Sequence, residues 1–254
     1  MRTVIIIGYG NVAQAIAPAI NASKGFTVKQ ILHRTPGDPE QLPPFPIVNS
    51  FDQLEEADIY MLCVNDDAIS EVSQALPFSD RLVVHTSGSI PMDTLADHKR
   101  RGVFYPLQSF TKGKRIAWKE VPLCLESAVP EDLELLKALA AALSPRVYEI
   151  NSEQRKKIHL SAVVVNNFTN HLYYLAETLC KEHDIPFEIL HPLLLETAQK
   201  VQRMDPYTAQ TGPARRNDQK TLNSQLIQVR NTPLEEVYKV LTASILATYE
   251  REKL

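Results

Sequence analysis

The sequence has few cysteines, no excess of basic residues and no long apolar run. Its three cysteines, Cys63, Cys124 and Cys180, show no CxxC spacing, which excludes both a disulfide framework and a zinc site of ordinary spacing. Cys63 and Cys124 lie in apolar runs, so we interpret them as core thiols rather than redox or nucleophilic groups. Three cysteines without disulfide or zinc spacing predict a protein of a reducing, cytoplasmic compartment with no bound metal.

The charge balance and the apolar runs exclude further classes of protein. Lysine and arginine total 27 against 30 aspartates and glutamates, a net charge of −3, whereas nucleic-acid-binding proteins usually carry a basic surface. No stretch approaches about 18 consecutive apolar residues, so we expect no membrane span. The apolar run in MRTVIIIGYG is too short for a signal peptide, and no cleavage-like segment follows it. The expected partner is a small molecule, not nucleic acid or membrane.

Residues 1–151 alternate apolar strands with helices. A chain of 254 residues, 44% of them hydrophobic, is long enough for two domains. Several strands are continuous apolar runs, as expected where both faces of a sheet are covered. The pattern predicts an α/β domain with a doubly wound, mostly parallel Rossmann sheet. The expected strands are Thr3–Ile7, Val28–His33, Ile59–Val64, Leu82–His85, Val103–Tyr105, Leu123–Leu125 and Val147–Ile150, and the expected helices are Val12–Ala22, Ala68–Ala75 and Glu131–Leu143.

Residues 152–254 contain no strand-like run and predict a smaller, all-helical domain. We expect one long helix over 152–183 and another over 187–204. A polar loop over 205–217 precedes two further helices, near 218–230 and 233–252, and Asp218 is the expected N-cap of the first of these.

A glycine fingerprint follows the first expected strand. In VIIIGYGNVAQAIA, the residues Gly8, Gly10 and Ala13 form the pattern G-x-G-x-x-A at a helix start. The first glycine allows a tight turn, the second lets a pyrophosphate approach the backbone, and the small third residue lets helix and strand pack closely. The helix N-terminus supplies N–H groups for the phosphates. The alternative is a glycine turn without a ligand, and Pro18 should kink or shorten the helix. The predicted cofactor-binding residues here are Gly8, Tyr9, Gly10, Asn11, Val12 and Ala13.

The end of the second strand predicts which dinucleotide binds. An NAD-binding protein usually has an acid there, whereas this chain has His33, Arg34 and Thr35. The guanidinium of Arg34 suits a 2′-phosphate, and Thr35 offers a hydroxyl donor. The nearest acid, Asp38, lies in a Pro/Gly turn. We therefore predict NADP in preference to NAD; the alternative is that Arg34 is a solvated charge at a strand end.

Two later strand ends should also border the cofactor, because ligands of such sheets bind at the carboxyl ends of the strands. They occur in CVNDDAI and HTSGSI, and the candidates are Val64, Asn65, Thr86 and Ser87. Asp66 and Asp67 are most simply helix N-caps. His85 is interpreted as a core histidine or as part of the site.

The long helix at 152–183 places amides, a histidine and tyrosines where a surface helix usually carries lysine and glutamate. At about 100° per residue, His159, Asn166 and Asn170 share one face. They suit either the wall of a polar pocket or a buried hydrogen-bond network at an interface. His159 is the candidate proton donor, because the imidazole pKa lies near neutral, and Lys156 is an alternative. Asn166 and Asn170 would orient the substrate.

Further substrate-binding candidates are Ser89, Gln108, Asn167 and Arg215. Arg215 and Arg216 lie together in TGPARRND. Such a pair suits a substrate carboxylate or a cofactor phosphate, although a solvated charge pair is an equal alternative.

Over essentially its whole length the chain resembles a bacterial family of NADP oxidoreductases with an N-terminal Rossmann-like domain and an uncharacterised all-helical C-terminal domain. The matching stretches are IIIGYGNVA, CVNDDAI, HTSGSI, GVFYPLQSF, SEQRKKIHLSAVVVNNFTNH and TGPARRND. The family is similar to pyrroline-5-carboxylate reductases, deazaflavin-dependent NADP reductases and β-hydroxyacid dehydrogenases. This resemblance implies a cleft between the domains and a homodimer formed through the helical domain.

The chain departs from these relatives at two places. β-Hydroxyacid dehydrogenases carry a catalytic lysine with asparagine four residues later, but here Leu160 follows Lys156 at that spacing. Tyr105 replaces the histidine of a His-Pro motif, which predicts a weaker catalytic role for that loop. We predict an oxidoreductase that transfers a hydride between NADP(H) and a small carbonyl or imine compound in the interdomain cleft. The alternatives are an NADP-binding sensor without turnover and a Rossmann domain without cofactor that acts through a helical dimer.

Overall fold

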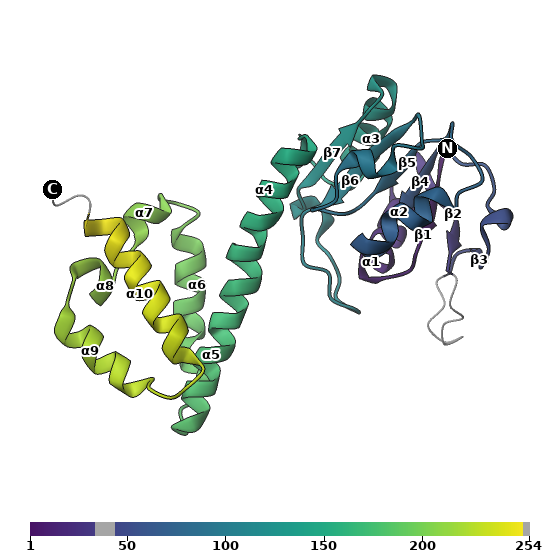
Figure 1. Cartoon of the computed structure of the whole chain (residues 1–254). Coiled ribbons are helices and arrows are strands. Elements are labelled where there is room, and N and C mark those ends of the chain that lie inside the picture. The colour runs from purple at the N-terminus through teal and green to yellow at the C-terminus, as the bar shows by residue number, and fades with distance from the viewer. Residues whose placement is uncertain (34–43, 251–254) are drawn as a thin grey trace. The chain divides into compact units, whose positions relative to one another are not determined.

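A computed structural model describes residues 1–33 and 44–250 of the chain. The chain divides into two compact units, Met1–Val164 and Val165–Leu254. In Figure 1 the first unit contains the sheet and the second is formed by helices.

The first unit is built on one eight-stranded sheet with the order β3-β2-β1-β4-β5-β6-β7-β8. Neighbouring strands are parallel except β6 and β7. The two-residue strand β3 was not predicted, because so short a segment has no periodicity to read. The strands are β1 (Arg2–Ile7), β2 (Phe26–Leu32), β3 (Ile47–Val48), β4 (Ile59–Leu62), β5 (Val83–His85), β6 (Arg101–Pro106), β7 (Leu123–Ser127) and β8 (Val147–Glu149).

Helices cover both faces of this sheet. α1 (Asn11–Ala22) and α3 (Pro130–Leu143) pack on one face, and the shorter α2 (Ile69–Gln74) packs on the other. The strands β1 and β4 are therefore buried on both sides, which explains their unbroken apolar sequences. Short 3₁₀ turns complete the connections: η2 (Phe51–Gln53), η3 (Asp66–Ala68), η4 (Met92–Leu95) and η5 (Trp118–Glu120). The predicted doubly wound, mostly parallel fold class is confirmed.

The core also explains two details of the sequence. Cys63 and Cys124 are buried, as predicted, and burial raises the pKa of the Cys63 thiol to about 12. Pro18 was expected to kink or shorten α1, but the helix continues through it to Ala22. Pro18 lies on the exposed side, and the apolar face of the helix, buried at Ala13, Ile16, Ala17 and Ile20, holds the helix against the sheet.

The helical part of the chain begins at Ser152, as predicted. α4 (Ser152–Ala162), a π-helical segment η6 (Val163–Phe168) and α5 (Thr169–Glu182) follow one another without a break. The two units nevertheless divide between Val164 and Val165, inside η6. The reason is that α4 is anchored to the sheet through Arg155, whose guanidinium pairs with Glu126 of β7.

The second unit contains the remaining helices. They are η7 (Phe187–Leu190), α6 (His191–Lys200), α7 (Pro206–Ala209), α8 (Pro213–Arg216), α9 (Gln219–Gln228) and α10 (Leu234–Glu250). The predicted polar loop over 205–217 was wrong in part, since it holds α7 and α8. Each of these short helices begins at a proline, and the Asp205 carboxylate caps α7 by accepting from Thr208 N. Asp218 caps α9, as predicted.

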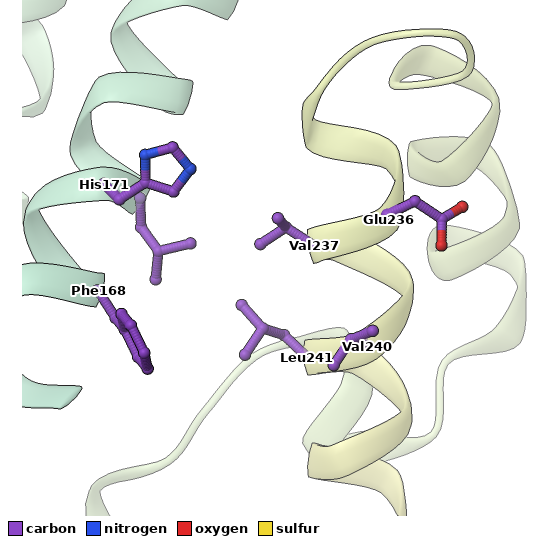
Figure 2. Close-up of a pocket in the computed structure, with 7 residues that line it drawn as sticks. Phe168, His171, Glu236, Val237, Val240 and Leu241 are labelled. Carbon is purple, nitrogen blue, oxygen red and sulfur yellow. The ribbon is translucent and has the colours of Figure 1, made fainter. Parts of the chain in front are cut away.

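The second unit exposes much apolar surface. α5 and α10, together with the end of η6, line a hollow of about 350 Å³ walled by Phe168, Leu172, Val237, Val240 and Leu241 (Figure 2). Over residues 1–33 and 44–250, no helix has the length and apolar character needed to cross a bilayer. The same ranges hold no cluster of three or more potential metal ligands of the His, Cys, Asp and Glu types.

Candidate functional site

The glycine turn joins β1 to α1 in a conformation that requires glycine. Gly8 has a φ of +97°, and a Cβ placed there would lie 2.5 Å from the carbonyl oxygen of Cys63. Gly10 is the N-cap of α1, and no side chain caps the helix and no acid lies in its first turn. The first backbone N–H groups of α1 are thus left for an external acceptor. This arrangement fits the pyrophosphate of a dinucleotide.

The predicted cofactor-binding residues converge on one edge of the sheet. β1, β4 and β5 are adjacent, so the glycine turn lies beside Val64–Asn65 and Thr86–Ser87, which follow β4 and β5. Thr86 Oγ1 donates to the Leu62 carbonyl at 3.3 Å, which ties the loop after β5 to the last residue of β4. His33 follows β2, and its ring lies 5.9 Å from that of Tyr9. Arg34 and Thr35 lie outside the described residues.

The loop after β5 is organised by its serine hydroxyls. Ser87 Oγ accepts from the backbone N–H groups of Ser89 and Ile90, each at 3.1 Å. Ser89 Oγ donates to the carboxylate of Asp66. The expectation that Asp66 and Asp67 are N-caps was wrong, because neither η3 nor α2 has a side-chain cap. The Asp66 carboxylate instead contacts the serine loop. A hydrogen-bonded chain therefore links the carboxyl ends of β4 and β5.

Tyr105 and His159 form a pair next to this loop. The Tyr105 hydroxyl and His159 Nδ1 lie 3.0 Å apart, and the two rings meet edge to face. Tyr105 belongs to β6 and His159 to α4. A Cβ on Gly88 would lie 2.5 Å from His159 Nδ1 and 2.7 Å from Tyr105 Cζ. The HTSGSI loop thus packs against both rings, and Gly88 is what allows this approach.

Tyr105 is a residue of the candidate site that the sequence did not single out. Because it replaces a histidine, the sequence predicted a weaker catalytic role for its loop. The signal available was its place in GVFYPLQSF, near the carboxyl end of an apolar strand, where a polar group faces the ligand edge of the sheet. Burial raises the pKa of Tyr105 to about 12, so its hydroxyl keeps its proton at neutral pH.

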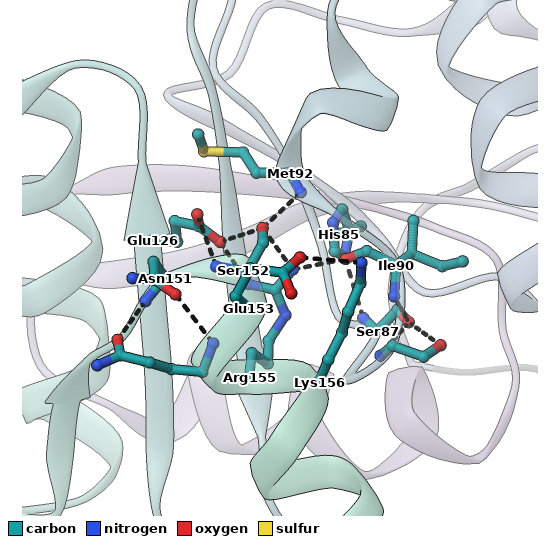
Figure 3. Close-up of polar contacts among 12 residues, drawn as sticks. His85, Ser87, Ile90, Met92, Glu126, Asn151, Ser152, Glu153, Arg155 and Lys156 are labelled. Atoms are coloured by element: carbon teal, nitrogen blue, oxygen red, sulfur yellow. Dashed lines mark hydrogen bonds and ion pairs between the residues drawn. The ribbon is translucent and has the colours of Figure 1, made fainter.

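Arg155 fixes the helix that carries His159. It is fully buried, and its guanidinium pairs with Glu126 and donates to the Ile90 carbonyl at 2.5 Å. Ser152 Oγ donates to Glu126 at 2.7 Å, and Met92 N donates to Ser152 Oγ at 3.0 Å. Figure 3 shows these contacts joining the start of α4 to the loop after β5 and to β7. Residues four apart share one helix face, so the anchor at Arg155 also orients His159.

The other catalytic and substrate-binding candidates are more exposed to solvent than Tyr105 and Arg155. Lys156 pairs with Glu153 at 3.1 Å on the surface of α4, and Gln108 Oε1 accepts from Ser109 N. In the second unit, Arg215 lies with its guanidinium carbon 3.9 Å from the centre of the Tyr249 ring. Asn166, Asn167 and Asn170 are exposed there.

The prediction that His159, Asn166 and Asn170 share one helix face assumed α-helical steps of about 100° throughout. That assumption was wrong, because Asn166 and Asn167 lie in the π-helical segment η6. A π-helix has i→i+5 hydrogen bonds and so takes more residues per turn, which shifts the register of every later side chain. Such segments occur frequently at functional sites.

His85 is a buried histidine, as one of the two interpretations held. Ser87 N donates to its Nδ1 at 3.2 Å. Burial, with the nearby positive charge of Arg155, lowers the pKa of His85 to about 4. The ring is therefore neutral in the folded protein at neutral pH and serves as a hydrogen-bond acceptor under the serine loop.

This depressed pKa predicts a pH-dependent stability. As pH falls below about 6.5, the usual pKa of histidine, the unfolded chain binds a proton at His85. The folded chain binds that proton only near pH 4, because its pKa at His85 is lowered to about 4. The free energy of unfolding should therefore fall across this window, by about 3 kcal/mol in total. Urea unfolding at pH 7.0, 5.5 and 4.5 measures it. His85→Asn, which keeps an acceptor near the position of Nδ1, should show a shallower pH dependence; an equal slope would contradict the assignment.

The fold and the glycine turn define a protein of the two-domain Rossmann dinucleotide-binding class. DUF2520, a domain of unknown function, matches residues 121–245. A Bacteroides fragilis crystal structure described as a "putative NADP oxidoreductase" is 38% identical, with 97% of this chain and 98% of that chain covered and a TM-score of 0.88. This chain therefore belongs to the family of Rossmann-type NADP oxidoreductases with a helical C-terminal domain that the Bacteroides protein represents.

More distant structures share the fold. An imine reductase from Streptomyces aurantiacus is 16% identical, with 98% of this chain and 94% of that chain covered and a TM-score of 0.71. An imine reductase from Myxococcus stipitatus, solved in complex with NADP+, is 15% identical, with 98% and 93% covered and a TM-score of 0.65. At these identities the likeness concerns the fold alone. No curated protein matches the sequence significantly.

Proposed function

We propose that the protein is an NADP-dependent reductase that acts on a small carbonyl or imine compound. The observation that carries this proposal is the Tyr105–His159 pair packed against the loop after β5, at the edge of the sheet where the glycine turn lies. Bound NADPH supplies the hydride in such chemistry. The chain itself has to supply a proton, and a histidine within hydrogen-bond distance of a hydroxyl is suited to do so.

The two residues of the pair have different roles. His159 acts in its protonated form, with Nδ1–H donated to the Tyr105 oxygen and Nε2–H available to the substrate. The Nε2 proton passes to the substrate as the hydride arrives, and the neutral ring keeps Nδ1–H and its hydrogen bond to Tyr105. Because Tyr105 remains protonated at neutral pH, it accepts this hydrogen bond as a neutral hydroxyl. His159 is thus the acid, and Tyr105 is a positioning residue.

Ser89 and Gln108 remain the predicted substrate-binding residues of the first unit, and Asn166, Asn167, Asn170 and Arg215 remain those of the second. Amides orient a carbonyl or amine by hydrogen bonds without supplying a proton themselves. The rival function, an NADP-binding sensor, needs the glycine turn but not the Tyr105–His159 pair.

Titration of the purified protein with NADPH and NADH tests the proposal. Fluorescence and melting temperature should report NADPH binding at lower concentration than NADH. A panel of keto acids and cyclic imines should then oxidise bound NADPH. Binding without turnover on any panel member would favour the sensor, and failure to bind either dinucleotide would reject both functions.

Arg34→Asp should reverse the preference for the coenzyme. Loss of charged hydrogen bonds to the 2′-phosphate, each about 1.5–3 kcal/mol, should raise the NADPH Kd at least about tenfold. The new carboxylate can accept from the ribose hydroxyls of NADH. Arg34 lies outside the described residues, so the prediction rests on its place after β2. Lys24→Asp, an exposed charge change in the same domain, is the control; equal effects of both substitutions on NADPH would contradict the prediction.

We also propose that the helical domain forms a homodimer. Val165, Ile189 and Val240 are 71%, 65% and 65% exposed, and Val240 lines the apolar hollow of Figure 2. An exposed apolar hollow rimmed by polar residues is the kind of surface that marks protein–protein contacts. Light scattering after size exclusion should give twice the chain mass, and Val240→Glu should shift the population toward monomer. A monomeric wild-type protein would contradict the proposal.

A further inference from the structure

A basic cleft runs along the outer flank of α1, beside the glycine turn. Its volume is about 520 Å³, within the range of small-molecule sites. One wall is the side of α1 that faces away from the sheet, and the other is the loop that follows β6. The described lining residues are Tyr9, Asn11, Gln14, Ala15, Pro18, Ala19, Thr111, Lys112, Gly113, Lys114, Arg115, Ile116 and Trp118.

The charged residues among the described lining of this cleft are all positive. Lys112, Lys114 and Arg115 line it, and no carboxylate does so among the described residues. Neither Lys114 nor Arg115 has an ion-pair partner within residues 1–33 and 44–250. The whole chain carries a net charge of −3, so this local cluster of positive charge has the opposite sign to the net charge of the chain. Like charges along one cleft repel one another, and a bound anion reduces the repulsion.

The loop that carries these cations is held in place at both ends. Asn11 Nδ2 donates to the Phe110 carbonyl at 3.2 Å, which ties the start of the loop to the first residue of α1. Lys114 N donates to the Thr111 carbonyl at 3.1 Å across a turn with Gly113 at a φ of +78°. Trp118 packs on the core at the other end. The cations are therefore presented by an ordered loop toward α1.

We propose that this cleft binds phosphate groups through Lys114 and Arg115, in addition to the N–H groups of the glycine turn. A guanidinium and an ammonium on one loop suit a phosphate, which offers several acceptor oxygens. Asn11, the first residue of α1, lines the cleft, so the partial positive charge at the start of α1 adds to that of the loop. The phosphates belong either to the dinucleotide, an assignment that rests on the proposed function, or to a second phosphorylated molecule.

Isothermal titration with inorganic pyrophosphate tests the cleft on the full chain. The wild-type protein should bind it, and Lys114→Gln/Arg115→Gln should weaken binding at least about tenfold. Lys119→Gln removes an exposed lysine just outside the cleft and should leave the affinity unchanged. Melting temperatures establish that the variants fold, and Lys114→Gln alone replaces the double variant if that one does not.

Repeating the titration with saturating NADPH separates the two sources. If NADPH displaces pyrophosphate and the double variant also weakens NADPH, the cleft holds phosphates of the dinucleotide. If pyrophosphate binds equally well beside NADPH, the cleft holds a second molecule. Charge-dependent binding of pyrophosphate by a protein that fails to bind NADPH would reject the proposed function and keep the cleft. The cleft proposal is overturned if pyrophosphate does not bind, or if the double variant behaves like Lys119→Gln.

Discussion

His159→Ala is expected to lower kcat by about 10²- to 10⁴-fold, the usual contribution of a positioned general acid, and to leave the NADPH Kd unchanged. The imidazole lies 3.0 Å from the Tyr105 hydroxyl and against Gly88, whereas the glycine turn that would hold the dinucleotide is formed by other residues. Tyr105→Phe keeps the ring and removes one hydrogen bond. It should cost about tenfold in kcat, equivalent to about 1.4 kcal/mol.

Single-turnover and steady-state rates with the best substrate of the panel would measure these effects, and NADPH titration would measure binding separately. Lys156→Ala is the matched control, because Lys156 lies one turn before His159 on α4 and pairs with Glu153 at the surface. The assignment is rejected if Lys156→Ala abolishes turnover while His159→Ala does not. An equal loss of NADPH affinity in both Tyr105→Phe and His159→Ala would instead indicate a structural role for the pair.

Arg155→Leu is expected to lower the free energy of unfolding by about 3–5 kcal/mol, the usual cost of removing one partner of a buried ion pair. The Arg155 side chain is 1% exposed and that of Glu126 is 15% exposed, so the substitution leaves a largely buried carboxylate without its counterion. Ser152 also depends on this carboxylate, since both its N–H and its hydroxyl donate to Glu126. The start of α4 should therefore loosen together with the ion pair.

Urea unfolding of three variants measures this prediction. Arg146→Leu is the matched control, because Arg146 pairs with Glu120 at 2.8 Å while both side chains are more than half exposed. It should cost less than about 1 kcal/mol. Arg155→Leu/Glu126→Gln should recover part of the loss, since no unpaired charge remains. Equal costs for Arg155→Leu and Arg146→Leu would contradict the buried anchor.

Local features of the sequence were sufficient for much of the fold. The strand-turn-helix context of Gly8 and Gly10 and the apolar runs of β1 and β4 identified the sheet without any knowledge of contacts. Strand β3 and the helices α7 and α8 were missed because each is too short to show a period. The π-helical register of η6 was also missed, because nothing in VVVNNF distinguishes a π-turn from an α-turn.

The sequence by itself determined the Rossmann sheet, the glycine turn and the start of the helical region. These features follow from short-range chemistry: which residues tolerate a tight turn, and which runs must be buried on both faces. Only the tertiary structure decided that Tyr105 meets His159, that Asp66 meets Ser89, and that Arg155 is a buried anchor for α4. Each of these contacts joins residues more than 20 positions apart, and the side-chain period of a single element carries no information about which other element it faces.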